Sequence, residues 1–375
     1  MELKLLHTAD IHLDAPFPSL GNKEAARRKD LLDCFERLVN LAIKNEVHLF
    51  VVAGDLFDSP RPSAQVVGKV QAGLQRLADR GIVSVLLPGT HDHLVAPDSV
   101  YRKTLFPGAI LLDSARIETP QVVKISGIDV FIYGFAYHPR FSEGAMSGFK
   151  RTSEAGIHIG VLHGSLKGSP EWDHRGKDLP FSLEDVKSWG LDYLALGHYH
   201  NFALYKPVQG TVACYSGSPE GRRFGENGPR YCALVTMGAE GAVVKKLQIN
   251  QRSLVEETID VSGVTTEETL ASNIRRFADS NVILRVTLAG VVEVPFELDR
   301  LYHRCEEEFF FLEIQDKTDL FDSSLVKDIQ DEETIRGLFV RRIGSLIEKV
   351  DPEEHQILEE ALREVLARFS REHKG

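Results

Sequence analysis

Short apolar runs alternate with helical patterns over the N-terminal half of the chain. Six runs have the length of a strand, and each ends in polar residues or glycine: 4–10, 48–55, 83–89, 130–135, 157–164 and 191–198. In residues 24–44 and 63–79, apolar residues recur at spacings of three and four, which predicts amphipathic helices. The stretch "SLEDVKSWG" predicts a shorter helix, with Ser182 as its N-cap and Gly190 at its end. Strands that alternate with helices and are buried on both faces predict a layered α/β fold, with helices flanking sheets of largely parallel strands.

The pattern changes beyond residue 250. Residues 254–290 show strand, helix and strand in turn, which predicts a small α+β module over 251–328. Two amphipathic helices follow, over 332–350 and 353–370, and Asp351-Pro352 separates them as an N-cap and first-turn pair. We therefore expect three parts: a large domain over 1–250, a small domain over 251–328 and a helix pair over 329–375. The helices either pack on each other and their own domain or bind a partner.

Composition and charge narrow the class of protein. With 375 residues, 43% of them hydrophobic, the chain is long enough for one large core and smaller ones. The net charge of −11 is uneven, because residues 251–375 hold 16 basic and 28 acidic residues and residues 1–250 hold 28 and 27. The acidity belongs to the C-terminal third, so a nearly neutral N-terminal domain could still bind nucleic acid.

The location follows from what the chain lacks. Its first residues contain no signal-peptide pattern, and no run reaches the roughly 20 apolar residues of a membrane span, so we expect a cytoplasmic protein with no membrane association. The four cysteines form no C-x-x-C pair, which favours reduced, unpaired thiols.

Side chains that can bind metals follow five of the strand-like runs in chain order. They are Asp10 and His12 in "DIH", Asp55 and Asp58 in "GDLFD", Thr90, His91 and Asp92 in "GTHD", His163, and His198 and His200 in "GHYH". One such residue after a strand is usually a cap or a solvated loop residue, but five motifs in order favour a shared site. Because ligand sites of such sheets lie beyond the carboxyl ends of the strands, we expect these side chains to meet at one rim.

The mixture of aspartate and histidine indicates the chemistry of that site. Imidazole is a borderline ligand and carboxylate a hard one, so together they suit manganese, iron or zinc better than calcium or magnesium. Two cations about 3.5–4 Å apart would clamp a phosphoryl group and supply the nucleophile for in-line attack. We expect two divalent ions, manganese first, with iron, zinc and magnesium as alternatives.

The same motifs carry a family resemblance. The series D-x-H, G-D-x-x-D, G-[N]-H-D, G-H and G-H-x-H resembles the calcineurin-like metallophosphoesterase superfamily. The stretches "HTADIHLDAPF", "VVAGDLFDSPRPS", "VLHGS" and "GSPEGRRFGENGPR" are similar to bacterial DNA-repair exonucleases of the SbcD type, particularly their YhaO-like branch. The resemblance covers residues 1 to 235.

The resemblance implies a role for each of these residues. One metal would be held by Asp10, His12, Asp55 and His200, and the second by Asp55 as a bridge, the residue at position 90, His163 and His198. A metal-bridging hydroxide would attack the phosphorus. His91 would then act as general acid or stabilise the developing charge, with Asp58 or Asp92 orienting its ring.

Two positions depart from the family pattern. Thr90 stands where the family usually has asparagine, and its hydroxyl is a shorter and weaker ligand than an amide oxygen. The second metal is therefore expected to bind less tightly, through Thr90 or a water, or not to bind under ordinary conditions. Asp58 stands where the SbcD-type nucleases often have histidine, whereas the wider superfamily has aspartate at this position.

Features outside the metal motifs suggest partners. Arg222 and Arg223 are candidates for contacts with DNA phosphates, because the guanidinium fork matches phosphate oxygens, although a solvated loop would also carry two arginines. The resemblance further implies a small domain that caps the cleft, C-terminal helices that dock an SMC-like coiled-coil ATPase of the SbcC or YhaN type, and a homodimer.

These observations predict a metal-dependent phosphodiesterase that acts on DNA, as an exonuclease subunit of a double-strand-break repair complex. Endonuclease activity of the same subunit is compatible with this prediction. A phosphoesterase for nucleotides or other small esters is one alternative. A second is a catalytically weak scaffold that binds DNA ends and the ATPase, and Thr90 is the residue that supports it.

Overall fold

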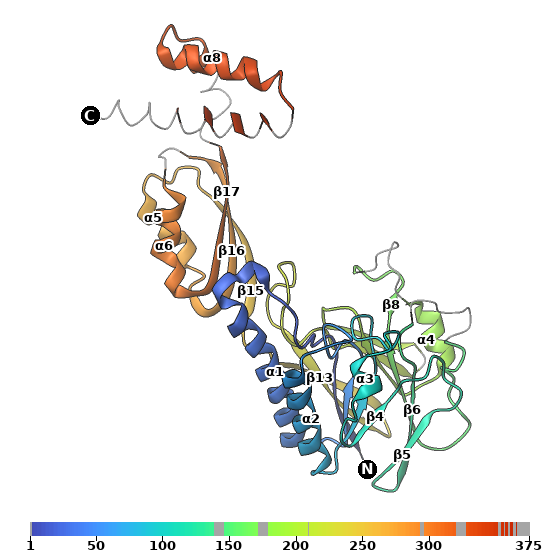
Figure 1. Cartoon of the computed structure of the whole chain (residues 1–375). Coiled ribbons are helices and arrows are strands. Elements are labelled where there is room, and N and C mark those ends of the chain that lie inside the picture. The colour runs from blue at the N-terminus through green and yellow to red at the C-terminus, as the bar shows by residue number, and fades with distance from the viewer. Residues whose placement is uncertain are drawn as a thin grey trace. The chain divides into compact units, whose positions relative to one another are not determined.

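The structure is a computed structural model that describes residues 2–138, 146–171, 179–208, 210–292, 296–319 and 328–351, together with residues 354, 355, 357, 358, 361, 362 and 365. The chain divides into two compact units, Met1–Ser253 and Leu254–Gly375 (Figure 1). In the part of the chain that is described, no helix is both long enough and apolar enough to cross a membrane. All four cysteines are buried free thiols, as the sequence predicts.

Two six-stranded sheets form the first unit. The first sheet has the order β14-β13-β1-β2-β3-β4, with the bounds β1 Leu3–Thr8, β2 Leu49–Val52, β3 Val83–Leu86, β4 Ala109–Leu111, β13 Tyr231–Gly238 and β14 Gly241–Gln248. The second has the order β11-β12-β10-β7-β6-β5, with the bounds β5 Gln121–Ile125, β6 Ile128–Gly134, β7 Ile157–His163, β10 Tyr193–Gly197, β11 Ala203–Val208 and β12 Thr211–Tyr215. In each sheet, four neighbouring strands run parallel. In the first sheet β13 and β14 add antiparallel pairs on one side, and in the second sheet both edge strands, β11 and β5, pair antiparallel with their neighbours.

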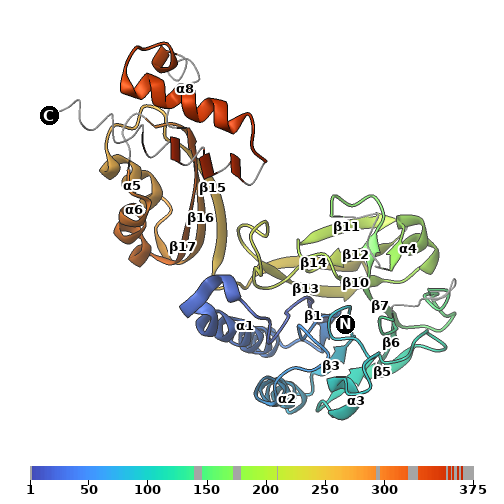
Figure 2. The ribbon, with the colours of Figure 1, turned by 45° about the horizontal axis from the view of Figure 1, so that its top comes forward.

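The two sheets pack face to face over one apolar core. Leu5, Val51 and Val85 of the first sheet and Ile159 and Ala195 of the second are fully buried in the same cluster. Helices cover the outer faces: α1 (Glu24–Lys44) and α2 (Ala64–Ala78) lie on the first sheet and α4 (Leu183–Trp189) on the second (Figure 2). Short elements complete the unit: η1 (Pro18–Lys23), α3 (Val100–Lys103), β8 (Ser165–Leu166) and β9 (Pro180–Phe181).

The elements predicted from apolar periodicity are present in the first unit. All six strand-like runs contain strands, and the two long helical patterns match α1 and α2 within a residue. In α4, Ser182 and Asp185 form a capping box, and Gly190 ends the helix with a φ of 63°. The layered α/β fold is therefore confirmed.

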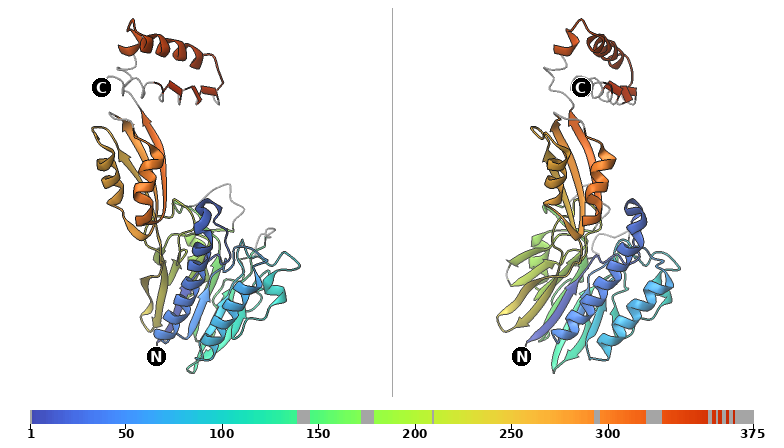
Figure 3. Two further views of the ribbon diagram at one scale, coloured as in Figure 1. Left: turned by 60° about the vertical axis from the view of Figure 1, so that its left-hand side comes forward. Right: turned by 90° about the vertical axis from the view of Figure 1, so that its left-hand side faces the viewer.

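The second unit contains a three-stranded sheet in the order β15-β16-β17 (Figure 3). The bounds are β15 Ser253–Asp260, α5 Glu267–Arg275, β16 Asp279–Val291, α6 Leu298–Cys305, η2 Glu306–Glu308 and β17 Phe309–Asp319. Leu270, Ile274 and Leu301 of the two helices share a buried cluster with Leu284 and Leu312 of the sheet. Strand, helix and strand thus follow one another as the sequence predicts.

One of the two expected C-terminal helices is described in full, as α8 (Ile335–Ile347). Thr334 caps it, accepting a hydrogen bond from the backbone N–H of Gly337. Most of the helix expected over 353–370 lies outside the described residues, but Asp351 accepts from the backbone N–H of Glu354 at 3.1 Å, which is the N-cap bond expected there.

Candidate metal centre

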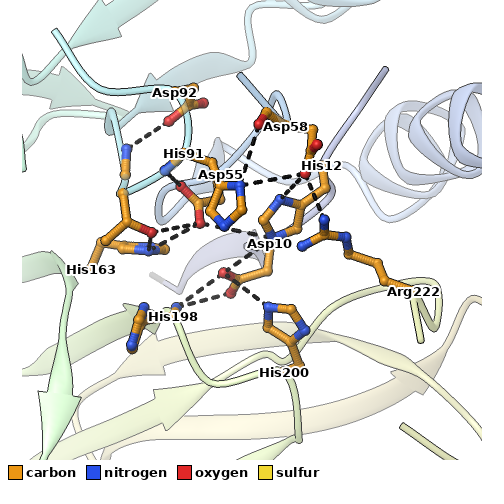
Figure 4. Close-up of polar contacts among 12 residues, drawn as sticks. Asp10, His12, Asp55, Asp58, His91, Asp92, His163, His198, His200 and Arg222 are labelled. Carbon is orange, nitrogen blue, oxygen red and sulfur yellow. Dashed lines mark hydrogen bonds and ion pairs between the residues drawn. The ribbon is translucent and has the colours of Figure 1, made fainter. Parts of the chain in front are cut away.

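The side chains predicted to bind metals converge where the two sheets meet (Figure 4). Asp10 and His12 follow β1 and Asp55 follows β2 in the first sheet, while His163 ends β7 and His200 follows β10 in the second. Three groups of metal-capable side chains each have ligand atoms within 4.8 Å of one another: Asp10, His12 and His200; His12, Asp58 and His91; and Asp10, Asp55 and His163. The rim expected from the strand ends is therefore formed by both sheets.

Three of the histidines share one pattern of ring contacts. Nδ1 of His163 lies 3.0 Å from the Ala53 carbonyl oxygen, which can only accept, so Nδ1 carries the proton. Nδ1 of His12 lies 3.2 Å from Asp58 and Nδ1 of His200 lies 2.7 Å from Glu226. Each ring is thus anchored through Nδ1 and turns Nε2 toward the carboxylates, which is how metal-binding histidines are usually held.

A buried histidine nitrogen without a hydrogen-bond partner indicates that this place suits a cation. Nε2 of His12 is buried and has no hydrogen-bond partner among the described residues. It lies 4.0 Å from Asp10 Oδ1 and 3.8 Å from Asp55 Oδ2, too far for a hydrogen bond with either. Burial lowers the pKa of His12 to about 4, so the ring is neutral and its lone pair is available. A divalent cation between these three atoms would satisfy all of them, and the residues therefore fit a metal.

Asp55 and His163 form a buried ion pair in the group that also contains Asp10. Burial opposes both charges, but their mutual attraction outweighs it, with His163 Nε2 3.3 Å from Asp55 Oδ2. It raises the pKa of His163 to about 10 and holds the pKa of Asp55 well below its usual range. A proton on His163 thus balances the buried carboxylate, and a bound cation would displace it.

His91 lies at the open side of the cluster. Its ring is 45% exposed, and Nδ1 lies 3.3 Å from the Asp58 carbonyl oxygen and 3.4 Å from Asp58 Oδ1. The hydrogen bond to Asp58 raises the pKa of His91, with burial acting against it. Asp58 itself is partly buried, which favours its neutral form, yet hydrogen bonds from His12 and His91 and the Arg222 charge hold its pKa well below the usual range. An ionised Asp58 therefore orients a readily protonated His91.

The structure distinguishes the two aspartates that the sequence offered as partners of the His91 ring. Asp92 is fully buried and accepts hydrogen bonds from the backbone N–H groups of Gly89 and Phe57 at 2.7 and 3.1 Å and from the Tyr101 hydroxyl at 2.7 Å. These contacts hold the loop after β3. Asp92 thus positions the loop that bears Thr90 and His91, while Asp58 contacts the ring.

Thr90 points into the cluster. Its hydroxyl donates to Asp55 Oδ2 at 3.1 Å and lies 3.4 Å from His163 Nε2. The hydroxyl therefore lies beside Asp55 and His163, two of the residues to which the family resemblance assigns the second metal. Its reach is one atom shorter than that of an asparagine amide oxygen.

His198 is placed differently from the other predicted ligands. Its backbone N–H donates to both carboxylate oxygens of Asp10, at 3.2 and 3.0 Å, and its ring centroid lies 5.2 Å from that of His163. It belongs to none of the three metal-capable groups found among the described residues. The backbone of His198 thus contacts Asp10, and its ring lies beside that of His163.

The backbone at the cluster is strained. Positive φ angles occur at Asp10 (53°), His12 (51°), Asp55 (51°) and His198 (100°), a region that costs non-glycine residues about 1–2 kcal/mol each. The two sheets also approach closely, because a Cβ on Gly197 would lie 1.9 Å from the Ala53 carbonyl oxygen and one on Gly54 2.1 Å from His163 Nδ1. Packing of the sheets therefore maintains a geometry that the local sequence disfavours.

The segment after β12 contributes residues that the sequence only partly indicated. Arg222, predicted to contact DNA, reaches into the cluster and donates to Asp58 Oδ1 at 2.6 Å. Arg223 is 82% exposed and lies beside Glu226. Glu226, which the sequence analysis missed, is the partner of His200. The stretch "GENG" that contains Glu226 can be read in the sequence, but no spacing rule predicts that a glutamate contacts a histidine 26 positions earlier.

A cavity of about 730 Å³ opens onto the cluster. Asp55, Thr90, His91, His198 and His200 line one side of it, and Phe17, Arg222 and Phe224 are among the residues of the other sides. A phosphate ester in this cavity would have direct access to the metal-capable side chains and to His91.

Comparisons with known proteins agree with this geometry. This chain is 30% identical to the uncharacterized metallophosphoesterase YhaO of Bacillus subtilis. The match extends over 63% of this chain and 58% of YhaO. The chain is also 27% identical to the DNA double-strand break repair protein Mre11 of Methanopyrus kandleri, over 78% of this chain and 67% of that protein. To the protein of the same name from Saccharolobus solfataricus it is 30% identical, over 58% of this chain and 55% of that protein. The chain thus spans little more than half of the length of YhaO and of the Saccharolobus protein. Residues 3–202 match the calcineurin-like phosphoesterase family, and the chain is a member of that family of metallophosphoesterases.

Proposed function

We propose that this protein is a metal-dependent phosphodiesterase that cleaves DNA, as the exonuclease subunit of a double-strand-break repair complex. The observation that supports hydrolysis is the convergence of two aspartates and three histidines beside an open cavity, with Nε2 of each histidine facing inward: Asp10, His12, Asp55, His163 and His200. Support for DNA as the substrate comes from the relatives named DNA double-strand break repair proteins.

The proposed ligand sets follow the two buried groups. Asp10, His12 and His200 would hold one cation and Asp55 with His163 the second, with Asp55 between them and Thr90 and His198 at the second ion. Divalent cations bound there would polarise the phosphoryl oxygens and lower the pKa of an attacking water. Manganese is the metal that we expect first.

Side chains of the protein would donate the proton to the leaving group and contact the DNA backbone. His91 faces the cavity, and its raised pKa keeps it protonated to higher pH than an ordinary histidine, so that it can donate a proton to the leaving oxygen. Asp58 holds that ring through Nδ1 and leaves Nε2 for the substrate. Arg223, which is largely exposed at the cavity, would contact a neighbouring phosphate of the DNA backbone.

We also propose that the protein binds a macromolecular partner through α8. The α8 helix exposes Ile335 and Leu338, with 78% and 62% of their surfaces accessible. Such residues on one amphipathic helix suit an apolar groove on an SMC-like coiled-coil ATPase of the SbcC or YhaN type. We further propose a homodimer and a cytoplasmic location.

Reconstitution with manganese tests the proposed function. Metal content per chain and cleavage of a DNA duplex are measured on the wild type and on Thr90→Asn, with bis-p-nitrophenyl phosphate as a small ester. Two metals and DNA cleavage in the wild type are the expected result. Cleavage of the small ester with indifference to DNA would instead establish a small-molecule phosphoesterase.

A second candidate function has one observation in its favour. The Thr90 hydroxyl, in place of the longer asparagine amide, weakens the second site and favours a scaffold that binds DNA ends and the ATPase. One metal and no cleavage in the wild type, with both restored by Thr90→Asn, would support that function over the nuclease.

A further inference from the structure

The segment Pro219–Glu226 contacts the candidate metal centre at two points. At one end, Glu226 Oε1 lies 2.7 Å from Nδ1 of His200. Near its middle, Arg222 donates to Asp58 Oδ1 at 2.6 Å through Nη2. The backbone N–H of Arg222 donates to the second Glu226 oxygen at 2.8 Å, which joins the two contacts directly (Figure 4 shows the Arg222 side).

Glu226 is held too firmly for its contact with His200 to be incidental. Only 6% of the residue is exposed, and both of its carboxylate oxygens have hydrogen-bond partners. The carboxylate accepts the Nδ1 proton of His200, so Nε2 of that ring faces Asp10, 3.9 Å from Oδ1. A carboxylate in this position fixes the tautomer and ring orientation of a metal-binding histidine and makes its other nitrogen a stronger donor to the metal.

We infer that Glu226 is a positioning residue for the first metal, acting through His200. The inference rests on the metal centre of the proposed function and names a residue that the ligand motifs do not contain. Loss of such an outer partner typically weakens metal binding about 10–100-fold. Through Arg222, the same segment also holds Asp58, so one short stretch of chain joins His200 on one side of the centre to the Asp58–His91 pair on the other.

A second glutamate in the same segment provides a matched control. Glu220 is 1% exposed and accepts from Arg27 and Arg37, both at 2.9 Å, and from the backbone N–H of Gln251. These contacts attach the segment to α1 and to the end of β14. Glu220 thus anchors the segment without touching His200, and its replacement separates loosening of the segment from loss of the His200 partner.

Calorimetric titration of the metal-free full chain with Mn²⁺ tests the inference without an activity assay. We expect Glu226→Gln, which keeps the shape and loses the charge, to weaken the tighter manganese site 10–100-fold. Glu226→Asp, which keeps the charge, should lose less, and it serves if the glutamine variant does not fold. Glu220→Gln should lower the unfolding temperature of the metal-free protein while its manganese affinity stays within threefold of the wild type.

A double-variant cycle with His200→Asn completes the test. If Glu226 acts through His200, adding Glu226→Gln to His200→Asn produces no further loss of affinity. Wild-type affinity in Glu226→Gln, an equal loss in Glu220→Gln, or additive losses in the double variant would each overturn the inference. Two manganese ions bound without any phosphodiester cleavage would overturn the proposed function and leave the role of Glu226 intact, whereas a wild type that binds no manganese would end both.

Discussion

At the scale of single residues, four histidines of the centre are oriented by the acceptor on Nδ1. His12, His163 and His200 direct Nε2 to the carboxylates, whereas His91 is held by Asp58 at the cavity wall with nearly half of its surface exposed. The same side chain therefore has two roles, and its partner and exposure decide which.

This difference predicts the effect of His91→Asn. The variant should cleave phosphodiesters about 10²–10⁴-fold more slowly, because a general acid is lost, and should bind as much manganese as the wild type. Parallel measurement of kcat and of metal content per chain checks both parts. Undiminished cleavage would remove His91 from the mechanism.

Asp92 supports a different prediction, about stability. Asp92→Ala leaves the N–H groups of Gly89 and Phe57 and the Tyr101 hydroxyl without their acceptor, which should lower the free energy of unfolding by about 1–3 kcal/mol. Tyr101→Phe removes only one of the three bonds and should cost about 0.5–1.5 kcal/mol. Urea unfolding of the two variants decides the matter, and equal losses would mean that the backbone bonds to Asp92 contribute nothing.

Residues of the centre differed in how far sequence alone could place them. Asp10, His12, Asp55, His163 and His200 each follow or end a strand, so chain order and strand polarity were enough to bring them together. Glu226 and the inward turn of Arg222 could not be found in this way, because both depend on where an irregular segment folds back. The orientation of the His198 ring is likewise a property of a left-handed backbone that no periodicity encodes.

At the scale of elements, buried parallel strands were the most predictable part of the fold. The strands β1, β2, β3, β7 and β10 are mostly apolar and almost continuously buried, because both faces of each strand are covered. The antiparallel strands β13 and β14 were not predicted. β13 mixes buried with partly buried residues, no residue of β14 is fully buried, and their place beside β1 depends on pairing across most of the first unit.

His7 of β1 joins the two sheets, with Nδ1 2.9 Å from the Tyr193 hydroxyl of β10. Complete burial lowers the pKa of His7 to about 3. Since this value lies below the pKa of about 6.5 in the unfolded chain, the stability contributed by neutral His7 is fully present above pH 6.5 and is lost as the pH falls toward 3.

We therefore expect the free energy of unfolding to fall between pH 6 and pH 4 by about 1.4 kcal/mol per pH unit more in the wild type than in His7→Gln. Denaturant unfolding of both proteins across that range measures the difference in slope. His303→Gln, at an exposed histidine of α6, is the control and should keep the wild-type slope. Parallel slopes for the wild type and His7→Gln would refute the account.

At the scale of the whole molecule, net charge is distributed unequally between the two units. The net negative charge lies beyond residue 250, and α8 of the second unit exposes apolar side chains that a water-facing helix does not need. The first unit carries the metal centre, so catalysis and partner binding are expected to respond to separate substitutions.

The double variant Ile335→Asp with Leu338→Asp tests this separation. It should weaken binding to the purified SMC-like ATPase at least tenfold, equivalent to about 1.4 kcal/mol, and leave cleavage of bis-p-nitrophenyl phosphate unchanged. Val122→Asp, at a residue of β5 that is 56% exposed, is the matched control and should bind the ATPase normally. ATPase binding that survives the double variant would place the partner elsewhere.

The pairing of β1 with β13 also sets an order for biosynthesis. Leu3 is translated well before its partner Met237, which is added only after most of the first unit. At about 5–20 residues per second, the interval is on the order of ten to fifty seconds, during which one edge of β1 has no neighbour. We therefore expect nascent chains of this protein to bind a ribosome-associated chaperone, and a metal held by His200 would bind fully only after His200 and Glu226 have been translated.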